Sequence, residues 1–323
     1  MKFIMFKQAG VAARVLFLNE ASIPNIKNDE VLVKVMARPI NPSDYMFIQG
    51  QYRAKPVFPQ IAGLEGSGVI EKTGESVIDF KTGDHVAFRA VGTWAEYIVI
   101  KQDLLILVNN NIAFEQSCQL ALNPVTAFGL LTLSGCNAES FLLLSAGASA
   151  LAAIILQLAK EKGIKVICLV RHLSQQEELY RIGALAVLDQ NDPDLSTSIN
   201  KLTGNAGITS FLDAVGGRLL SIIIPLMQTG GKIIIYGRYD TNPAELYNAD
   251  IIYRNLNILG FGIAQWEAEQ TKERRELMFR SLIEKIVDKT LVLPHTQSFK
   301  LSDFVHAIEE DNSKKSGKIL LIS

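Results

Sequence analysis

The chain has 323 residues, 48% hydrophobic and 20% charged, a length and composition that suit about two soluble folded domains. Its formal net charge of −1 provides no excess of basic side chains, so we expect neither nucleic acid nor a membrane surface as a partner. Only three well-separated cysteines occur, which argues against a disulfide framework and favours the reducing cytoplasm.

Residues 1 to about 120 are predicted to form short strands. Apolar or alternating segments lie at 30–36, 66–72, 84–88 and 95–100, and Gly and Pro separate them at intervals of roughly ten residues. This spacing predicts a compact, barrel-like β domain. From Phe114 to Phe128 the pattern changes to that of a helix, which we expect to lead into a second domain.

Residues 141–171 are predicted to form a strand, a turn, a helix and a second strand. The apolar run 141–144 is followed by small residues, and apolar residues then recur with helical spacing at Leu151, Ile154, Ile155 and Leu158. A membrane span is the alternative, because residues 141–159 contain no charge over 19 positions. The small residues at its centre and the strand pattern directly behind it favour a buried strand and helix.

The turn between this strand and helix is a degraded dinucleotide-binding motif. Residues 147–152 read Gly-Ala-Ser-Ala-Leu-Ala, in which only the first glycine of Gly-x-Gly-x-x-Gly is intact. Small residues allow close approach of a pyrophosphate to the free amides at the start of a helix. A parallel-sheet turn without a ligand is the alternative. The second strand ends at Arg171, where an acidic residue would suit NAD and an arginine suits the 2′-phosphate of NADP, so NADPH is favoured over NADH. A solvated arginine at the end of a strand is the alternative.

The α/β alternation continues along the chain. Helical segments are predicted at 175–182, 194–202 and 219–226, and strands at 186–188, 210–213 and 230–237. This predicts a doubly wound parallel sheet, whose carboxyl edge would carry Gly147, Arg171, Val215 and Tyr236. The remainder is predicted to form a strand at 256–261, one long helix at 267–287 and a final strand at 318–322, and to fold back onto the first domain.

Several short motifs together resemble the medium-chain dehydrogenase/reductase superfamily. They lie at 40–44 (INPSD), 63–68 (GLEGSG), 83–86 (GDHV), 183–184 (GA), 213–217 (DAVGG) and 317–318 (GK). The resemblance implies an α/β fold with two domains and commonly a homodimer. A GroES-like β-barrel catalytic domain would span residues 1–120 and be completed by about 258–323. A Rossmann doubly wound parallel sheet that binds NADPH would span 121–257.

Zinc is not expected. Zinc members of the superfamily place a catalytic cysteine near the position of Asn41 and a histidine at that of Leu64, and they carry a lobe with four further cysteines. Leucine cannot bind a metal, and no cysteine precedes Cys118. A lone histidine, His85, is more often structural than a ligand.

Within the zinc-free branch, the segment 49–56 (QGQYRAKP) resembles the part of NADPH-dependent 2-enoyl thioester reductases that carries their catalytic tyrosine, which maps to Tyr52. Further matches lie at 92–94, 123–127, 149–151 and 260–261. The resemblance implies cofactor contacts from Asn41, Asn123, Gly147, Ala148, Ser149, Ala150, Leu151, Arg171, His172, Leu173, Tyr236, Gly237, Arg238, Tyr239, Phe261, Gly262, Ile263, Ala264 and Lys318.

Three residues differ from those usual in these reductases. Ala148 and Ala152 replace the usual Asn and Gly, and Gly262 stands where a tryptophan usually follows Phe261. The cofactor fold tolerates these changes, but Gly262 removes bulk from the expected substrate wall. A quinone or small enone is therefore an alternative substrate, and a non-catalytic NADPH-binding sensor or structural protein is an alternative of another class.

The implied reaction delivers a hydride to the β-carbon of an activated double bond and places negative charge on the carbonyl oxygen. Tyr52 is the candidate donor to that oxygen, since a phenol stays protonated at neutral pH. Without the resemblance, Tyr52 would be interpreted as a packing or surface tyrosine in a loop. Asn41 and Asp44 follow a proline-containing turn, and their alternative role is to cap a helix.

Overall fold

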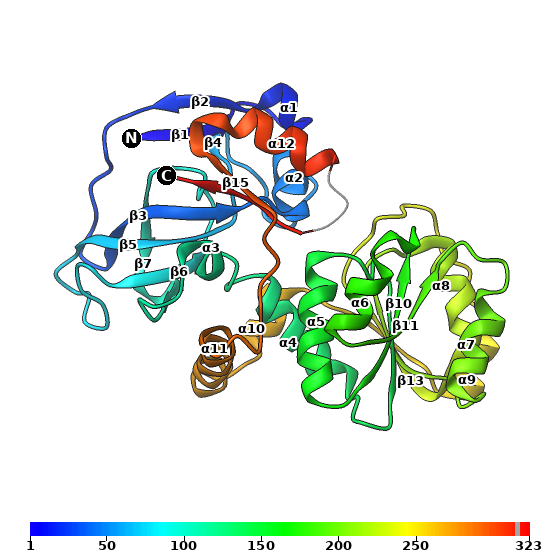
Figure 1. Ribbon diagram of the computed structural model, residues 1–323. Helices are drawn as coiled ribbons and strands as arrows, with labels where there is room; N and C mark the ends of the chain where they lie inside the picture. Colours follow the sequence, from blue (N-terminus) through cyan, green and yellow to red (C-terminus); the bar gives the residue numbers. More distant parts are fainter. Residues whose placement is uncertain (314–316) are drawn as a thin grey trace. The chain divides into compact units, whose positions relative to one another are not determined.

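The computed structural model describes residues 1–313 and 317–323, and the chain divides into two compact units (Figure 1). The first unit consists of Met1–Pro124 and Phe279–Ser323, and the second consists of Val125–Met278. The sequence-based boundary at 120/121 lies close to the first division. The boundary expected at 257/258 lies earlier than the observed one at 278/279, because the intervening segment packs with the second unit.

The second unit, described throughout, is built on a six-stranded parallel sheet. Its strands are β9 (Phe141–Leu144), β10 (Lys165–Val170), β11 (Ala184–Asp189), β12 (Ile208–Asp213), β13 (Met227–Ile235) and β14 (Asn257–Gly260). They lie in the order β11-β10-β9-β12-β13-β14, and every neighbouring pair is parallel. The order reverses beside β9, as in doubly wound dinucleotide folds. The predicted Rossmann-type sheet is therefore confirmed.

Helices cover both faces of this sheet. In Figure 1, α5 and α6 lie on one side of the strands and α7, α8 and α9 on the other. The helices that lie within this unit are α5 (Ala150–Glu161), α6 (Gln176–Ile182), α7 (Leu195–Thr203), α8 (Gly217–Ile223), α9 (Asn248–Arg254) and α10 (Ile263–Ala268). Between the sheet and these helices lies an apolar core that includes Leu143, Ile167, Phe211 and Ile233, all fully buried. Burial of both faces explains the nearly continuous apolar strands.

The segment considered as a membrane span is divided between β9 and α5. Ser149 caps the helix, because its side chain accepts a hydrogen bond from the Ala152 amide at 3.1 Å. The helix ends at Glu161 and Gly163 follows with a φ of 67°, the left-handed conformation that glycine adopts readily. In the part of the chain that the structure describes, no helix is long and apolar enough to cross a membrane.

The first unit is rich in β-structure. A mainly antiparallel sheet has the order β15-β16-β3-β5-β6-β8, with β7 paired to β3, and a smaller sheet has the order β2-β1-β4. The strands are β1 (Lys2–Phe6), β2 (Phe17–Glu20), β3 (Glu30–Pro39), β4 (Gln60–Ile61), β5 (Glu65–Thr73), β6 (His85–Arg89), β7 (Tyr97–Lys101), β8 (Leu105–Leu107), β15 (Gln297–Lys300) and β16 (Ile319–Ile322). Because β16 pairs with β3, the end of the chain returns to the first unit.

Short helices accompany these sheets: α1 (Ala12–Val15), α2 (Pro42–Ile48), α3 (Phe114–Ser117) and α12 (Phe304–Ser313). Helix α4 (Asn123–Ser134) begins in the first unit and continues into the second, whereas α11 (Lys272–Val287) passes from the second back to the first. A buried apolar cluster that includes Ile4, Phe6, Phe47 and Trp94 lies between α2, α12 and the strands.

Two helix predictions are wrong in their extent. The helix expected from Phe114 to Phe128 is two helices, α3 and α4, which a turn at 118–122 separates. The long helix expected at 267–287 is α10 followed by α11, with residues 269–271 between them. In this second case Trp266 is buried, and its ring centroid lies 6.1 Å from that of Phe261 and 6.3 Å from that of Phe128. This packing keeps α10 against the second unit.

Candidate active site

The carboxyl ends of β9 and β12 are joined by a buried carboxylate. Ser145, directly after β9, donates a hydrogen bond from Oγ to Asp213 Oδ1 at 2.8 Å and accepts one from the Ala214 amide at 2.8 Å. The Asp213 carboxylate also accepts from the amides of Val215 at 2.9 Å and Gly216 at 3.0 Å. These bonds satisfy the backbone of the turn after β12 and hold it beside the turn after β9.

Gly147 lies where the backbone of the first turn passes closest to β10. A Cβ on this residue would lie 2.7 Å from Cys168 Cβ and 3.1 Å from the Leu169 carbonyl oxygen, so glycine is required by space. The turn leads directly into α5, whose first amides lack partners within the helix. Ala148, Ser149, Ala150 and Leu151 form this turn and helix start, which suits a bound phosphate.

Arg171, His172 and Leu173 follow β10 and are all exposed to solvent. Because β9 and β10 are parallel neighbours, Arg171 lies at the same edge of the sheet as Gly147. The guanidinium is therefore available to an anion at this edge.

The segment after β13 passes close to the turn after β12. The Tyr236 amide donates to the Asp213 carbonyl at 2.9 Å, and the Tyr239 amide donates to the Ala214 carbonyl at 3.2 Å. The Tyr236 hydroxyl is buried and has no hydrogen-bond partner among the described residues. Burial raises the pKa of Tyr236, so the phenol stays protonated and can donate to a ligand. Gly237 is half-buried and Arg238 is exposed.

Phe261 follows β14 and its amide donates to the Ile235 carbonyl at 2.8 Å. Gly262 has an ordinary φ of −125°, and no atom of the described residues lies within 4 Å of a Cβ placed on it. Ile263 and Ala264 begin α10. The turns after β9, β10, β12, β13 and β14 all leave one edge of a parallel sheet, so the prediction that Gly147, Arg171, Val215 and Tyr236 share that edge is confirmed.

The first unit contains a second group of predicted residues, centred on Asn41. The Asn41 side chain donates from Nδ2 to Glu65 Oε1 at 2.8 Å and accepts from Lys318 Nζ at Oδ1. Its backbone amide donates to Asp44 Oδ2 at 2.7 Å, which caps the start of α2. Asn41, Asp44, Glu65 and Lys318 are all buried. We call these four residues the Asn41 cluster.

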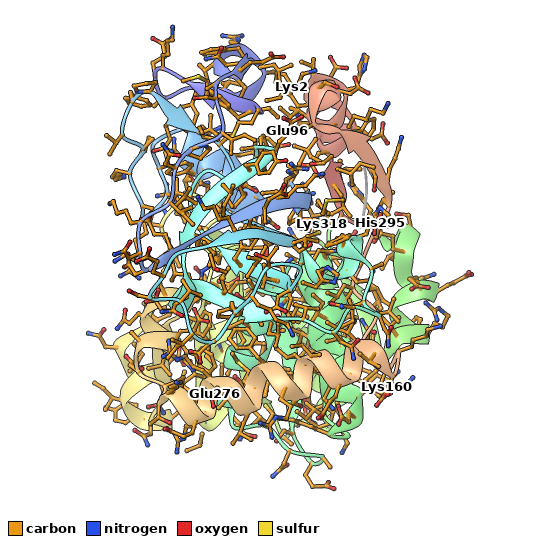
Figure 2. The ribbon with its side chains drawn as sticks, turned by 90° about the vertical axis from the view of Figure 1, so that its left-hand side faces the viewer. Lys2, Glu96, Lys160, Glu276, His295 and Lys318 are labelled. Carbon is orange, nitrogen blue, oxygen red and sulfur yellow. The ribbon has the colours of Figure 1, made fainter. Side chains whose placement is uncertain are left out.

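Burial dominates the electrostatics of the Asn41 cluster. It raises the pKa of Asp44 to about 8, against the opposing effects of the Asn41 amide and the Lys318 ammonium. It also raises the pKa of Glu65 to about 7, against the effects of the Asn41 side chain, Lys318 and Arg89. Figure 2 shows Lys318 near His295, where the Thr296 amide donates to the Lys318 carbonyl at 2.9 Å and fixes its backbone.

Tyr52 lies in the loop after α2 and is half-buried against the apolar cluster of the first unit. Its amide donates to the Met46 carbonyl at 3.0 Å. Partial burial raises the pKa of Tyr52, with Arg89 opposing and Asp44 assisting the shift. Tyr52 and the Asn41 cluster therefore share charged neighbours. Asn123, at the start of α4, is half-buried.

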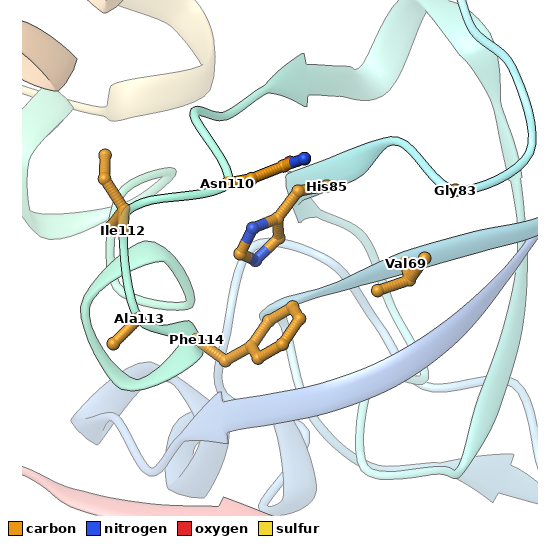
Figure 3. Close-up of a pocket in the computed structure, with 7 residues that line it drawn as sticks. All are labelled: Val69, Gly83, His85, Asn110, Ile112, Ala113 and Phe114. Carbon is orange, nitrogen blue, oxygen red and sulfur yellow. The ribbon is translucent and has the colours of Figure 1, made fainter.

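A shallow cavity of about 310 Å³ lies elsewhere in the first unit (Figure 3). His85 lies over Phe114 in this cavity, with ring centroids 4.0 Å apart, and burial lowers its pKa. None of the predicted site residues lines it; its lining residues are Val69, Gly83, His85, Asn110, Ile112, Ala113 and Phe114. We therefore do not assign it to the candidate active site.

Two family models match the chain. Residues 27–110 match the alcohol dehydrogenase GroES-like domain, and residues 150–279 match the domain described as zinc-binding dehydrogenase. Together they cover more than half of the chain, with the GroES-like domain first and the dehydrogenase domain after it. The chain belongs to the medium-chain dehydrogenase/reductase superfamily.

Proteins similar to this chain align with it over nearly its whole length. A Xenopus tropicalis protein named mitochondrial enoyl-[acyl-carrier-protein] reductase is 27% identical over 320 residues, which cover 96% of this chain and 91% of that protein. Two solved structures are provisionally named NADPH:quinone reductases. The one from Bacillus thuringiensis is 27% identical, with a TM-score of 0.93, and that from Mesorhizobium loti is 29% identical, with a TM-score of 0.91. Each covers 100% of this chain, and this chain covers 98% of each.

The description of the second family model refers to zinc, so the side chains of this chain that could bind a metal are relevant. Leu64 is an apolar residue buried in the first unit. Among residues 1–313 and 317–323 there is no group of three or more His, Cys, Asp or Glu side chains that could hold a metal ion. Zinc independence stays a prediction.

Asp44 and Glu65 are the two residues of the Asn41 cluster that were not predicted as site residues. Each belongs to a family motif, Asp44 to that at 40–44 and Glu65 to that at 63–68, and helix capping is the alternative role given to Asp44. Asn41 and Lys318 were both predicted as cofactor contacts, but nothing in the sequence indicates that their side chains meet. Buried carboxyl groups inside motif segments are the signal that could have identified Asp44 and Glu65.

Proposed function

We propose that this chain is an NADPH-dependent oxidoreductase that reduces activated carbon–carbon double bonds, with 2-enoyl thioesters as the leading substrate class. The observation that carries the proposal is the edge of the parallel sheet, where Gly147 has no room for a side chain, α5 begins directly after it and Arg171 follows the next strand. The similarity to proteins named enoyl-[acyl-carrier-protein] reductase and NADPH:quinone reductase supports it.

The residues at this edge fit NADPH. The close backbone approach at Gly147 and the amides that begin α5 suit a pyrophosphate, and the exposed Arg171 suits a 2′-phosphate. The buried Tyr236 hydroxyl offers a donor without a partner among the described residues. In this proposal the remaining sheet-edge contacts come from Ala148, Ser149, Ala150, Leu151, His172, Leu173, Gly237, Arg238, Tyr239, Phe261, Gly262, Ile263 and Ala264, and those of the first unit from Asn41, Asn123 and Lys318.

NADPH, when bound, supplies the hydride that adds to the β-carbon of the substrate. The protein must then stabilise negative charge on the substrate carbonyl oxygen until a proton reaches the α-carbon and completes the reduction. Tyr52 is proposed as the donor, because the raised pKa of its phenol keeps the proton in place at neutral pH. Its half-buried position leaves part of the side chain accessible.

The test compares crotonyl-CoA and a naphthoquinone as acceptors, with NADPH and NADH, for the wild-type protein and Tyr52→Phe. We expect NADPH-dependent reduction of crotonyl-CoA and a loss of about 100-fold in that activity in Tyr52→Phe. Tyr97→Phe is the control, since Tyr97 is another half-buried tyrosine of the first unit. If NADPH binds and no acceptor is reduced, the chain is a cofactor-binding sensor rather than an enzyme.

Quinone reduction is the second candidate function. It is supported by the two structures provisionally named NADPH:quinone reductases and by the open space at Gly262, where a Cβ would meet no atom of the described residues within 4 Å. A quinone is flat and has no thioester group that must be positioned, so it could bind against this open side of the site. Turnover of the quinone alone, with full activity in Tyr52→Phe, would favour this function over enoyl reduction.

We also propose that the protein is a homodimer located in the cytoplasm. Strand β14 is an outer strand of the second unit's sheet, and apolar side chains near it are exposed, among them Leu246, Tyr247, Ile252, Tyr253 and Leu259. An exposed strand edge beside apolar side chains favours pairing with a second copy. Cys118, Cys136 and Cys168 are all free, which suits a reducing compartment.

A further inference from the structure

The orientation of the Asn41 side-chain amide is determined by two charged groups of opposite hydrogen-bonding capacity. An ionised Glu65 carboxylate can only accept, and it faces Asn41 Nδ2 at 2.8 Å. The Lys318 ammonium can only donate, and it faces Asn41 Oδ1. Rotation of the amide by 180° would place a donor against Lys318 and an acceptor against Glu65. The observed orientation is therefore the one that this pair of charges permits.

Burial makes this arrangement rigid. Asn41 and Glu65 are each 1% exposed and Lys318 is 4% exposed, so solvent cannot replace the bonds between them. The three side chains come from separate parts of the first unit: the residue before α2, the first residue of β5 and the residue before β16. Asn41 thus links Glu65 to Lys318.

Other charged and polar groups also face Glu65, and substitution of Glu65 would change their electrostatic environment. Arg89, at the end of β6, and the Leu122 amide, just before α4, both favour its ionised form. Asp44 and Cys118 lie close enough to interact with it electrostatically. Glu65 disfavours the charge of Asp44, whereas Lys318 favours the charges of both carboxyl groups. Lys318 is thus the cation shared by the two buried carboxyl groups.

We propose that Glu65 is a positioning residue for cofactor binding, which fixes the amide orientation of Asn41 and, through Asn41, the place of the Lys318 ammonium. This inference rests on the proposed function, in which Asn41 and Lys318 contact NADPH. Glu65 does not itself contact the cofactor; it acts through Asn41. Its substitution should weaken NADPH binding by way of Lys318, which a purely structural role would not do.

The experiment measures the NADPH dissociation constant by fluorescence titration and the melting temperature without cofactor. The variants are Glu65→Leu, Glu65→Gln, Lys318→Met and the double variant of Glu65→Leu with Lys318→Met. Glu71→Leu is the matched control, because Glu71 is an exposed glutamate on the same strand, β5. If Glu65→Leu does not fold, Glu65→Gln in the same two backgrounds carries the test.

We expect Glu65→Leu to weaken NADPH binding about tenfold, since it removes a charged hydrogen-bond partner from a buried amide. Glu65→Gln should recover part of this loss, because its carbonyl oxygen still accepts from Asn41 Nδ2. In the Lys318→Met background the effect of Glu65→Leu should fall to less than threefold, because interacting sites are not additive. Glu71→Leu should bind as the wild-type protein does.

Two results would overturn the inference alone. One is wild-type affinity for NADPH in both Glu65 variants. The other is an equal fold-loss of NADPH affinity from Glu65→Leu in the wild-type and Lys318→Met backgrounds. In each case the wild-type protein still binds NADPH and the proposed function stands. A wild-type protein without measurable affinity for NADPH overturns the proposed function and this inference together.

Discussion

Arg171 is the residue on which the choice between the two nicotinamide cofactors depends. It is exposed at the end of β10, and the first carboxylate after it in the chain is Glu177, on α6. An arginine fork binds a phosphate with charge-assisted hydrogen bonds, while the 2′-hydroxyl of NADH offers it no charge. We therefore expect Arg171→Ala to raise the dissociation constant of NADPH about tenfold and to leave that of NADH nearly unchanged.

Lys201→Ala is the control for this measurement, since Lys201 is an exposed cation near the end of α7. Titrations at low and high salt would separate a specific contact from general attraction, because screening weakens exposed charges. An equal loss of affinity for NADPH and NADH in Arg171→Ala would show that Arg171 does not recognise the 2′-phosphate.

The final strand, β16, is held in the first unit by Arg38 of β3. Arg38 is fully buried and donates to the Ala95 carbonyl at 2.7 Å, the Leu321 carbonyl at 3.2 Å and Ser323 Oγ at 3.0 Å. Burial lowers its pKa to about 9. Arg38→Met would remove the guanidinium donors from the buried Ala95 and Leu321 carbonyl groups, so we expect it to lower the free energy of unfolding by about 3 kcal/mol.

Urea unfolding measures this change, and Lys34→Met is the matched control because Lys34 is an exposed cation on the same strand. Lys34→Met, at this exposed position, should change the free energy of unfolding by less than about 0.5 kcal/mol. A stability of Arg38→Met equal to that of the control would mean that water or rearranged backbone satisfies the carbonyl groups.

Strand β14 is the element through which we expect the homodimer to form. Leu259 is 38% exposed on this strand, and a lysine there would place a charge in an apolar interface. Leu259→Lys should therefore dissociate the dimer at micromolar concentration, as seen by sedimentation. Ile78→Lys, at an 85% exposed position in the first unit, should leave the dimer intact. Dimers of unchanged stability in Leu259→Lys would exclude β14 from the interface.

Over the whole molecule, local patterns predicted the doubly wound sheet and the turns at its edge. Gly147 and Arg171 are separated from their strands by few residues, so periodicity and turn chemistry suffice to place them. The same patterns gave helices at 114–128 and 267–287 that were too long. Periodicity does not show the turn at 118–122 or the break at 269–271 that separates α10 from α11.

The Asn41 cluster could not be predicted as a unit. Asn41 and Lys318 are 277 residues apart, and Glu65 lies 24 residues from Asn41. Their meeting depends on the register in which β16 pairs with β3. The return of the final strand to the first domain was predicted, but no local pattern encodes its partner strand or register. The raised pKa values of Asp44 and Glu65 likewise follow from burial, which the amino-acid type alone would not suggest for a carboxylic acid.

The two raised pKa values predict an unusual dependence of stability on pH. Asp44 has a pKa of about 8 in the folded protein against 3.8, and Glu65 about 7 against 4.5. At a pH between the unfolded and folded pKa values, the folded state holds protons that the unfolded chain has released. The contribution of these protons to the free energy of unfolding is therefore complete at low pH and is lost as the pH rises toward 8. The loss is at most about 1.4 kcal/mol per pH unit for each proton.

The two tryptophans allow each unit to be followed separately between pH 6 and pH 8. Trp94 is buried in the first unit, with Asp44 and Glu65, and Trp266 is buried in the second. In Trp266→Phe, where Trp94 alone reports, we expect the urea midpoint of the first unit to fall as the pH rises. Adding Asp44→Asn should reduce this slope, since an amide does not titrate while its oxygen can still accept from the Asn41 amide. Adding Glu71→Gln, at the exposed glutamate of β5, should not change it. A midpoint independent of pH in Trp266→Phe would mean that both carboxyl groups are already ionised at pH 6, and that the Asn41 cluster carries two full negative charges beside Lys318.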